Sequence, residues 1–575
     1  MESEIVVLPL IAAIVVLALT MYLGISAARR THTLADYWVA GRSVDVFTNA
    51  SAISSNYLSA ASFLGVAAFV WANGFDGVWY ATGFAAGYIL LLLFIASPLR
   101  RFGEYTIPDF CDGRFDSDRL RHVGIMWTFV ISSLYIVAQM VGVGTLMEVV
   151  TGIPWVWGVI ALGGVITLYV AFGGMTGVTI AQMAQFWIMI TAMILPLIIL
   201  LPRHSYSEML MHAYNDRPAV AEEAEGAPAE ASTTVDGAAA FTPDQQVRFG
   251  SLHGWVSPFQ KWDLWGSVSL LVALVCGTAG LPHILARFYT NPNASAARWS
   301  TVWVLVFIGV FYITTPIWGT YARMVLGPDA AVRDAAGVAN PNSMMLVTSL
   351  EAGAWAQALV AAGAIAALLS TVSGLLIALS SAIAHDFYGE LLHPEASDTQ
   401  KMTVAKLAVV ICGALAILVG LAFRDANIAW MVGLAFAVAA STFFPLLVCG
   451  IWWRRMTEAG AFAGLMVGGG ISAVVVIGTL AKWWSFDQPA IVSVPAAFLA
   501  IFIVSRLTAN QSAEKWATWE RAFHQLHRPE REIPQHGELA DAAQTAEVAE
   551  VPADEPVETI QHEDEQAEEA DESEA

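Results

Sequence analysis

Charged side chains are scarce in this sequence, and its long apolar runs contain almost none. Only 13% of the 575 residues are charged and 57% are hydrophobic, and the mean hydropathy is +0.60. A soluble globular domain usually contains about 25% charged residues. Apolar runs recur through residues 5–506, each long enough for the roughly 20 residues that a helix needs to cross a ~30 Å hydrocarbon core. The composition excludes a soluble globular protein and predicts an all-α polytopic membrane protein, because a helix satisfies its own backbone in lipid.

Cysteine and nucleotide-binding motifs are also lacking. The four cysteines lie far apart without CxxC or His-flanked spacing, which argues against a metal site or a disulfide framework: Cys111, Cys276, Cys412 and Cys449. There is no GxxxxGK[ST] phosphate loop, so ATP hydrolysis is not expected. No Lys or Arg follows Arg531, which excludes a polybasic lipid-binding tail. We therefore expect neither an enzyme nor a nucleic-acid partner.

The apolar runs predict thirteen membrane spans. They cover residues 5–27, 44–70, 77–98, 122–150, 155–172, 177–201, 263–288, 299–325, 357–383, 403–423, 427–451, 458–480 and 488–506. With the N-terminus outside, the inner loops collect arginines such as Arg29, Arg30, Arg100 and Arg101, as short cytoplasmic loops do. The first run follows two acids and lacks a basic n-region, so it predicts a retained helix and not a signal peptide. We expect a multi-pass protein of the cell membrane with its C-terminus inside.

Two acidic segments lie outside the predicted spans. Residues 203–262 are rich in Ala, Glu, Gly and Pro, and they predict a flexible extracellular loop within a membrane domain of residues 1–506. Residues 507–575 begin with the amphipathic pattern "AEKWATWERAFHQL" and continue as acidic low-complexity sequence. We expect this second segment to be a largely disordered cytoplasmic tail.

The second span contains a stripe of hydroxyl groups in "NASAISSNYLSAASFLG". Four serines lie at i, i+4, i+8 and i+11, on one face of a helix: Ser51, Ser55, Ser59 and Ser62. Small residues with this spacing also let a neighbouring helix approach closely, and helix packing is the competing interpretation. Packing does not explain Asn56 and Tyr57 beside the stripe. A dense cluster of neutral oxygens would suit a helix interrupted around a small cation.

The ninth span has a second polar face. Ala367, Ser370, Thr371 and Gly374 lie at i, i+3, i+4 and i+7, so the two hydroxyls point the same way. Each hydroxyl could bond to the carbonyl one turn earlier, as Ser and Thr often do in membrane helices. Equally, two hydroxyls and freed carbonyls would satisfy Na⁺, which prefers hard oxygen ligands. Both interpretations stay open from the residues alone.

The seventh span, "LVCGTAGLPHILARFYT", is interrupted by Gly277, Gly280 and Pro282, so its interior cannot be a regular helix. An interrupted apolar segment in each half of a chain is typical of a transporter site. His283 could relay protons, but a structural hydrogen-bond donor is the favoured interpretation. Arg287 lies toward the predicted cytoplasmic end, and the positive-inside rule accounts for it better than an anion clamp does.

Further polar groups face the predicted bundle, but no Asp or Glu lies in the middle of any span. The fourth span carries a stripe of Thr128, Ser132, Tyr135, Gln139 and Gly142. Intramembrane polar groups are functional candidates, although neutral ones often only tie helices together. A site for an organic cation would usually keep a buried acid, so the absence of acids argues against such a substrate.

Six ordered motifs carry a resemblance to a known family. They are "SAASFLG" (59–65), "PLRRFGEYTIPDF" (98–110), "YIVAQMVGVG" (135–144), "YVAFGGMTGVTIAQMAQ" (169–185), "GTAGLPHILARFYT" (277–290) and "LSSAIAHDFY" (379–388). Over about residues 5–506 the chain resembles the sodium:solute symporter family, and within it the acetate permease-like branch, which imports small monocarboxylates. The resemblance implies a LeuT-type core of 5+5 helices in an inverted repeat, formed by spans two to six and seven to eleven.

The resemblance also implies a set of binding residues. Na⁺, the coupling ion, would lie between the second and ninth spans, with no organic cofactor. Its ligands would be the carbonyls of Ser55, Leu58 and Ala367 and the hydroxyls of Ser370 and Thr371. The substrate would lie beside it at mid-membrane, near Tyr57, Ser59, Ser62, Gln139, Thr278 and Pro282.

Two departures from the family pattern bear on the substrate. Relatives usually show Asp where this chain has Asn56, and many members show Asp in place of Gln182. The resulting carboxylate-free site suits an anionic substrate that brings its own negative charge to the bound Na⁺. Some relatives work beside a small companion membrane subunit, so the resemblance implies such a partner besides the carboxylate substrate and the membrane lipid.

We therefore expect Na⁺-coupled uptake of a small monocarboxylate by alternating access. Three alternatives remain. One is a Na⁺ symporter for another solute, such as proline, pantothenate or a sugar. Another is a transporter-derived sensor, which would need a phosphoacceptor His and ATP-binding Gly motifs after the last span, and the acidic tail has neither. A passive channel would carry solute without Na⁺ coupling.

Overall fold

The computed structural model describes residues 7–28, 33–103, 105–203, 209, 261, 263–327, 341–424, 428–483 and 488–528. The regular secondary structure of these residues is entirely helical. One compact unit extends through His527. The predicted acidic loop, apart from single residues at its edges, and the acidic sequence after residue 528 lie outside the described residues.

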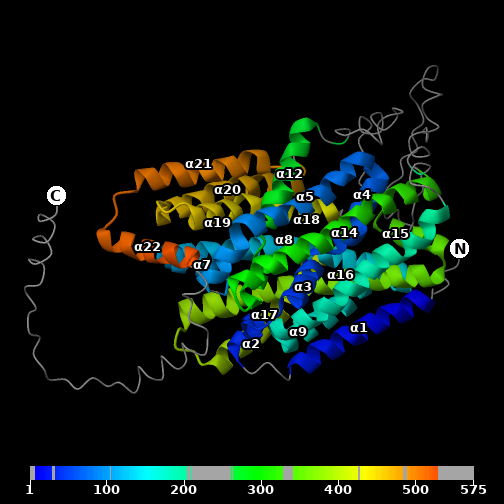
Figure 1. The fold of residues 1–575 in the computed structure, drawn as a ribbon. Coiled ribbons are helices and arrows are strands. Elements are labelled where there is room, and N and C mark those ends of the chain that lie inside the picture. The colour runs from blue at the N-terminus through cyan, green and yellow to red at the C-terminus, as the bar shows by residue number, and fades with distance from the viewer. Residues whose placement is uncertain are drawn as a thin grey trace, which may run out of the picture. The chain divides into compact units, whose positions relative to one another are not determined.

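Eleven helical stretches of the described residues are long and apolar enough to cross a membrane (Figure 1). Two of them, Ala61–Phe102 and Trp155–Arg203, each take in two or parts of two predicted spans. At 1.5 Å per residue, a straight helix of 49 residues would be ~74 Å long, more than twice the ~30 Å apolar core. Gly74 (φ 60°) and Gly174 (φ 55°) interrupt the two stretches. The protein is an all-helical polytopic membrane protein, while the count of thirteen spans and the orientation of the termini stay predictions.

The helices follow the predicted spans closely in sequence. Their bounds are α1 Val7–Ala28, α2 Leu34–Val39, α3 Val46–Tyr57, α4 Val66–Asn73, α5 Val78–Leu90, α6 Ala96–Phe102, α7 Ile107–Phe115, α8 Asp118–Thr151, α9 Trp155–Leu200, α12 Leu264–Thr278, α13 Pro282–Leu285, α14 Ala294–Leu326, α15 Met344–Thr348, α16 Ala354–Ser381, α17 Asp398–Gly420, α18 Ile428–Ser441, α19 Phe443–Trp452, α20 Glu458–Leu480, α21 Ala490–Leu507 and α22 Ala513–His527. Short 3₁₀ or π turns join several of them, including π turns at Ala61–Gly65 and Ala382–Leu392.

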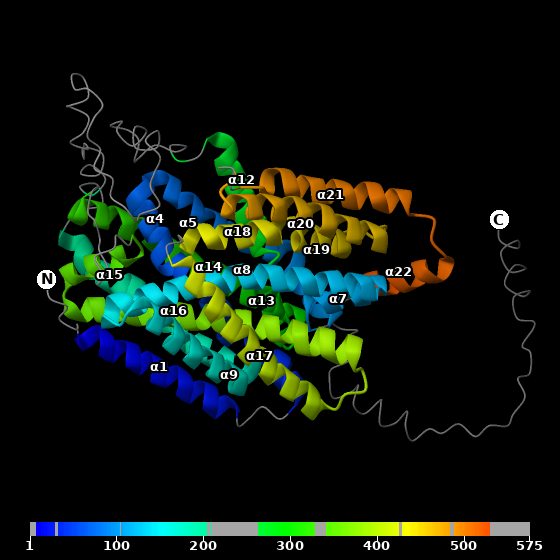
Figure 2. The same cartoon turned by 180° about the vertical axis from the view of Figure 1, so that it is seen from behind.

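Helix α16 lies at the centre of the packed helices. Within Ala354–Leu392, the stretch that contains α16, an apolar segment of 18 residues is 100% buried, whereas the corresponding segment of Val7–Ala27 in α1 is 28% buried. Figures 1 and 2 show α1 along one outer side and α20 and α21 along the opposite side, with α8 and α16 between them. Lipid-facing and buried helices are equally apolar, so hydropathy alone cannot separate them. The central position of α16 brings its Ser and Thr residues into the protein interior.

Two helices of the core are interrupted, as the sequence predicts. Helix α3 ends at Tyr57, the backbone leaves the helical region at Leu58 (ψ 74°), and helical structure resumes after Ser59. Helix α12 ends at Thr278, and α13 begins after the extended residue Leu281. Pro282 occupies the first turn of α13, where its missing N–H breaks no helical hydrogen bond. At both breaks, backbone N–H and C=O groups lack the hydrogen bonds that they would form within a continuous helix.

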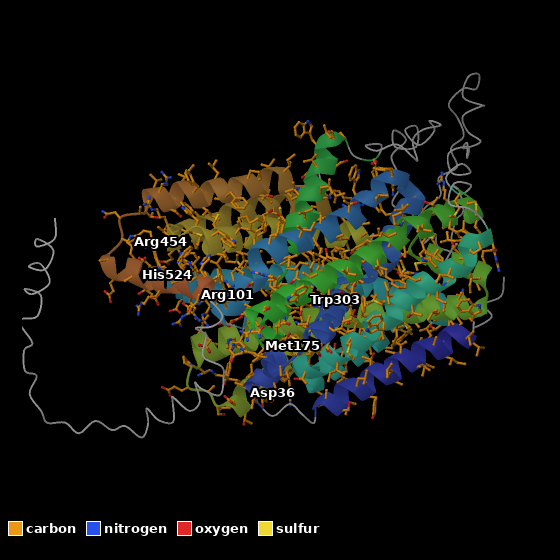
Figure 3. The ribbon with its side chains drawn as sticks, viewed as in Figure 1. Asp36, Arg101, Met175, Trp303, Arg454 and His524 are labelled. Atoms are coloured by element: carbon orange, nitrogen blue, oxygen red, sulfur yellow. The ribbon has the colours of Figure 1, made fainter. Side chains whose placement is uncertain are left out.

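The amphipathic helix predicted after the last span is present as α22, and it docks onto α6 and α7. The indole N–H of Trp519 donates to the Phe115 carbonyl (2.7 Å), and the Arg114 guanidinium donates to the Trp519 carbonyl (3.0 Å). Figure 3 labels Arg101 of α6, Arg454 and His524 of α22 at the same end of the packed helices, where Arg454 forms an ion pair with Glu520 of α22. The predicted domain boundary at residue 506 falls before this helix, which belongs to the compact unit.

Replacing Trp519 with Ala should lower the free energy of unfolding by ~3–5 kcal/mol, because the side chain is only 2% exposed and its removal leaves a cavity. Thermal unfolding of the detergent-solubilised chain measures the effect. The matched control is Trp516→Ala on the same helix, where the ring is partly exposed and its N–H bonds locally to the Ala509 carbonyl. Equal losses in the two variants would contradict a docked α22.

Candidate functional site

Helix α16 meets the break of α3 through direct hydrogen bonds. The Ser370 hydroxyl donates to the Ser55 carbonyl (2.7 Å) and lies 2.9 Å from the Ala367 carbonyl. The Thr371 hydroxyl donates to the Asn56 carbonyl (3.0 Å). All five residues are fully buried. Helix α16 and the end of α3 therefore place hard oxygen atoms from two elements within bonding distance of one another.

These contacts bear on the two interpretations of the α16 hydroxyls. Ser370 does bond to the carbonyl three residues earlier, but it also reaches across to α3. The Thr371 bond crosses to α3. Leu58 is buried at the break, where its ψ of 74° turns its carbonyl away from the helical direction. A cation bound between the two helices would be coordinated by lone pairs of the hydroxyl oxygens. The hydroxyl protons, which now point to the α3 carbonyls, would therefore have to rotate away.

The predicted substrate residues form two groups. The Tyr57 hydroxyl lies 2.7 Å from the Thr278 hydroxyl and donates to the Phe84 carbonyl (2.9 Å), so residues from both breaks meet there. Pro282 is buried just beyond the second break. The Tyr57 ring packs edge-on against the rings of Phe84, Tyr88 and Phe436, at 4.8–6.2 Å between centroids. This group combines an aromatic wall with hydroxyls.

The remaining substrate candidates line the second half of the broken span. The Ser62 hydroxyl lies 2.8 Å from the Tyr312 hydroxyl on α14. The Gln139 side-chain oxygen accepts from the Ala60 N–H (3.2 Å), while its Nε2 is buried without a partner among the described residues. Ser59 is buried at the break itself. A buried donor left unpaired costs about 1–3 kcal/mol, so Gln139 offers a free N–H to a ligand.

Arg287 lies inside the protein, and its assignment to the positive-inside pattern stays a prediction, because burial does not show toward which side of the membrane a residue lies. The side chain is 0% exposed. It donates to the Thr179 hydroxyl (2.6 Å) and to the side-chain oxygen of Gln182. Gln182 in turn donates to the Ser370 carbonyl (2.7 Å). His283 has no hydrogen-bond partner for either ring nitrogen among the described residues, so the structural donor role expected for it is not seen.

A second polar cluster joins two of the motifs that carried the family resemblance. The Thr106 hydroxyl donates to Asp386 (2.8 Å), and Asp109 contacts His385 (3.1 Å) and Arg121 (3.2 Å). Burial alone would raise the pKa of the Asp109 carboxyl, but the His385 ring, the Arg121 guanidinium and the Thr106 hydroxyl bring the pKa below its usual 3.8. The arrangement is an ion-pair network that ties α7 to the end of α16. Sequence reasoning missed this cluster, although both motifs were visible.

A model of the sodium:solute symporter family matches residues 37–468, more than half of the chain. The fold is similar to that of a Na⁺-coupled sialic acid symporter in a substrate-bound, outward-open state. The TM-score is 0.66 at 16% identity, covering 87% of this chain and 98% of that one. It is also similar to MHP1, a nucleobase-cation-symport-1 family transporter in a closed conformation, with TM-score 0.50, 14% identity and coverage of 84% and 98%. These neighbours are LeuT-like, which agrees with the core that the resemblance implies.

Proposed function

The chain belongs to the sodium:solute symporter family, and from that premise we propose that it couples Na⁺ entry to the uptake of a small monocarboxylate, such as acetate, propionate, pyruvate or lactate. The observation that carries the proposal is the junction between α16 and the break of α3. There Ser370 and Thr371 reach the carbonyls of Ser55 and Asn56 at 2.7 and 3.0 Å. Hydroxyl and carbonyl oxygens are ligands that suit a hard cation such as Na⁺.

The charges around the junction support an anionic solute. None of the described residues that hydrogen-bond to the predicted Na⁺ and substrate residues is an Asp or Glu. A bound Na⁺ would therefore lack a negative counter-charge until the solute arrives. The carboxylate of the solute would supply it, and the Tyr57, Phe84 and Phe436 rings would contact its short alkyl group.

In the proposed alternating access, the two broken helices change their contacts with neighbouring helices as Na⁺ binds and leaves. Na⁺ at the junction would hold α16 against α3 and fix Tyr57 beside Thr278, which completes the solute site. Release of Na⁺ would free the same contacts, so that the repeats could rock against each other. The expected partners are the carboxylate solute, the surrounding lipid and a small companion membrane subunit.

Reconstituted uptake tests the proposal. We expect labelled acetate to accumulate in proteoliposomes when an inward Na⁺ gradient is imposed, and an inward proton gradient alone to give no accumulation. Unlabelled propionate, pyruvate or lactate should compete, because the carboxylate and the short chain are the recognised features.

Three results of the same uptake assay would contradict the proposed function. Competition by proline, pantothenate or glucose, with none from the monocarboxylates, would identify another solute. Counterflow of acetate that is identical with and without Na⁺ would identify a passive channel. Accumulation driven by the proton gradient alone would remove Na⁺ as the coupling ion.

A further inference from the structure

Arg287 is a buried cation whose partners are all neutral. Its side chain is 0% exposed, and it donates to the Thr179 hydroxyl and the Gln182 amide oxygen. Its Nε has no hydrogen-bond partner in the described part of the chain. Among the same residues, no Asp or Glu forms an ion pair with it. The guanidinium therefore keeps its full positive charge inside the protein, and its Nε–H has no acceptor among the described residues.

We propose that Arg287 binds a small monovalent anion, a carboxylate or a halide, in a buried site beside the predicted Na⁺ site. A buried charge without a counter-charge is strongly unfavourable, and intramembrane charges usually mark the paths of ions or substrates. The planar guanidinium suits a carboxylate, because adjacent N–H groups can donate to both of its oxygens. The inference goes beyond the proposed function, since the anion need not be the transported solute.

A second buried side chain without a hydrogen-bond partner lies four residues before Arg287 in the sequence. His283 lies in α13 and Arg287 in the 3₁₀ turn that follows, and the His283 ring packs against the Tyr135 ring at 5.4 Å between centroids. The His283 ring is 1% exposed, and neither ring nitrogen has a partner among the described residues. A neutral imidazole carries one N–H that can donate to an anion. This short helical segment thus carries two buried side chains with donor groups that have no acceptor among the described residues.

Gln182 connects this site to the predicted Na⁺ site. Its oxygen accepts from Arg287, and its Nε2 donates to the Ser370 carbonyl (2.7 Å) and to the Asn56 side-chain oxygen (3.4 Å). An anion that holds Arg287 in place would also hold Gln182 against α16 and α3. Anion binding and Na⁺ binding should therefore favour each other.

Arg114 shows what distinguishes Arg287 from another buried arginine. Arg114 is also 0% exposed and donates to the backbone carbonyls of Gly450 and Trp519. Its guanidinium, however, lies 5.0 and 5.6 Å from the ring centres of Phe115 and Phe523, and such aromatic faces stabilise a cation. No ring contact of this kind is recorded for Arg287 in the described structure. Arg114 is therefore a suitable control.

Thermal unfolding of the purified full chain tests the proposal. The protein is heated in sodium chloride, sodium acetate and sodium gluconate at equal Na⁺ concentration and ionic strength, so that only the anion changes. A small anion that binds the native protein should raise the melting temperature by about 2–5 °C relative to gluconate, and the rise should saturate. Acetate can also bind at the proposed solute site, so only the part of its stabilisation that is lost in variants of the Arg287 site is assigned to this site. If the acetate effect alone is lost in those variants, the site takes carboxylates; if a chloride effect is lost as well, it takes small anions in general.

Two variants of the site and one control variant give the test its specificity. In Gln182→Glu, a carboxylate of the protein faces Arg287 and replaces the anion, so the anion-dependent rise is lost, while the hydrogen bond from Gln182 to the Ser370 carbonyl is given up. Arg287→Gln should lose the rise as well. Arg114→Gln should melt at a lower temperature yet keep it. Equal melting temperatures in the three wild-type samples, or rises that are as large in Gln182→Glu and Arg287→Gln as in the wild type, would overturn the proposal.

Discussion

Removing the hydroxyls of Ser370 and Thr371 together should raise the Na⁺ concentration needed for half-maximal uptake of the proposed solute, acetate, by about a hundredfold or more. Each hydroxyl lies within 3.0 Å of a carbonyl at the α3 break. Contacts between a charge and a dipole contribute ~1.5–3 kcal/mol each, and 1.4 kcal/mol corresponds to a factor of ten. Uptake by proteoliposomes at varied external Na⁺ measures the shift in the Ser370→Ala, Thr371→Ala double variant.

The controls for this experiment lie on the same helix. Ser380 is equally buried, but its hydroxyl donates to the Ile377 carbonyl of its own helix (3.0 Å), so Ser380→Ala should leave the Na⁺ dependence unchanged. Thr371→Ser keeps the hydroxyl and should stay close to the wild type. An unshifted Na⁺ dependence in the double variant would remove these residues from the Na⁺ site.

Replacing Gly280 with Ala should abolish most uptake. The added methyl would lie 2.5 Å from the Ala439 carbonyl oxygen and 3.2 Å from the Phe444 N–H nitrogen. These are backbone atoms where α18 passes into α19, and they cannot rotate away as a side chain can. Overpacking of this kind costs ~1–3 kcal/mol and displaces the chain, here at the break that positions Thr278 beside Tyr57.

Gly164→Ala is the matched control, because an added methyl there has no atom within 4 Å. It should retain uptake and the amount of protein in the membrane. Comparing uptake at equal protein levels separates a damaged site from poor folding. Wild-type uptake by Gly280→Ala would mean that the tight contact between the α12 break and α18 is not needed for transport.

The interrupted helices could be predicted because their causes are local. Gly277, Gly280 and Pro282 disfavour a helix wherever they occur, and the serine spacing around Ser55 marks a polar face without knowledge of its neighbours. Arg287 could not be interpreted in this way. Its burial depends on α3 and α9 covering it, and only the three-dimensional packing shows that Thr179 and Gln182 reach its guanidinium.

Two other features were beyond sequence reasoning for related reasons. Asp109 and His385 lie 276 residues apart, so their contact depends on how α7 meets the end of α16. The central place of α16 could not be inferred either, since α1 is at least as apolar and yet lies at the periphery (Figure 2). Spacing along the chain reports which face of a helix is polar, and packing decides what that face touches.

The docking of α22 has a practical consequence for handling the protein. A chain cut just after the last apolar helix would remove Trp519, and with it the hydrogen bonds that Trp519 makes with the Phe115 carbonyl and the Arg114 guanidinium. Affinity tags, fluorescent reporters or protease sites intended to be inert should therefore be joined after His527 and not at residue 507. Substitutions in α22 that weaken its contacts with α7 would therefore test whether the C-terminal helix affects transport.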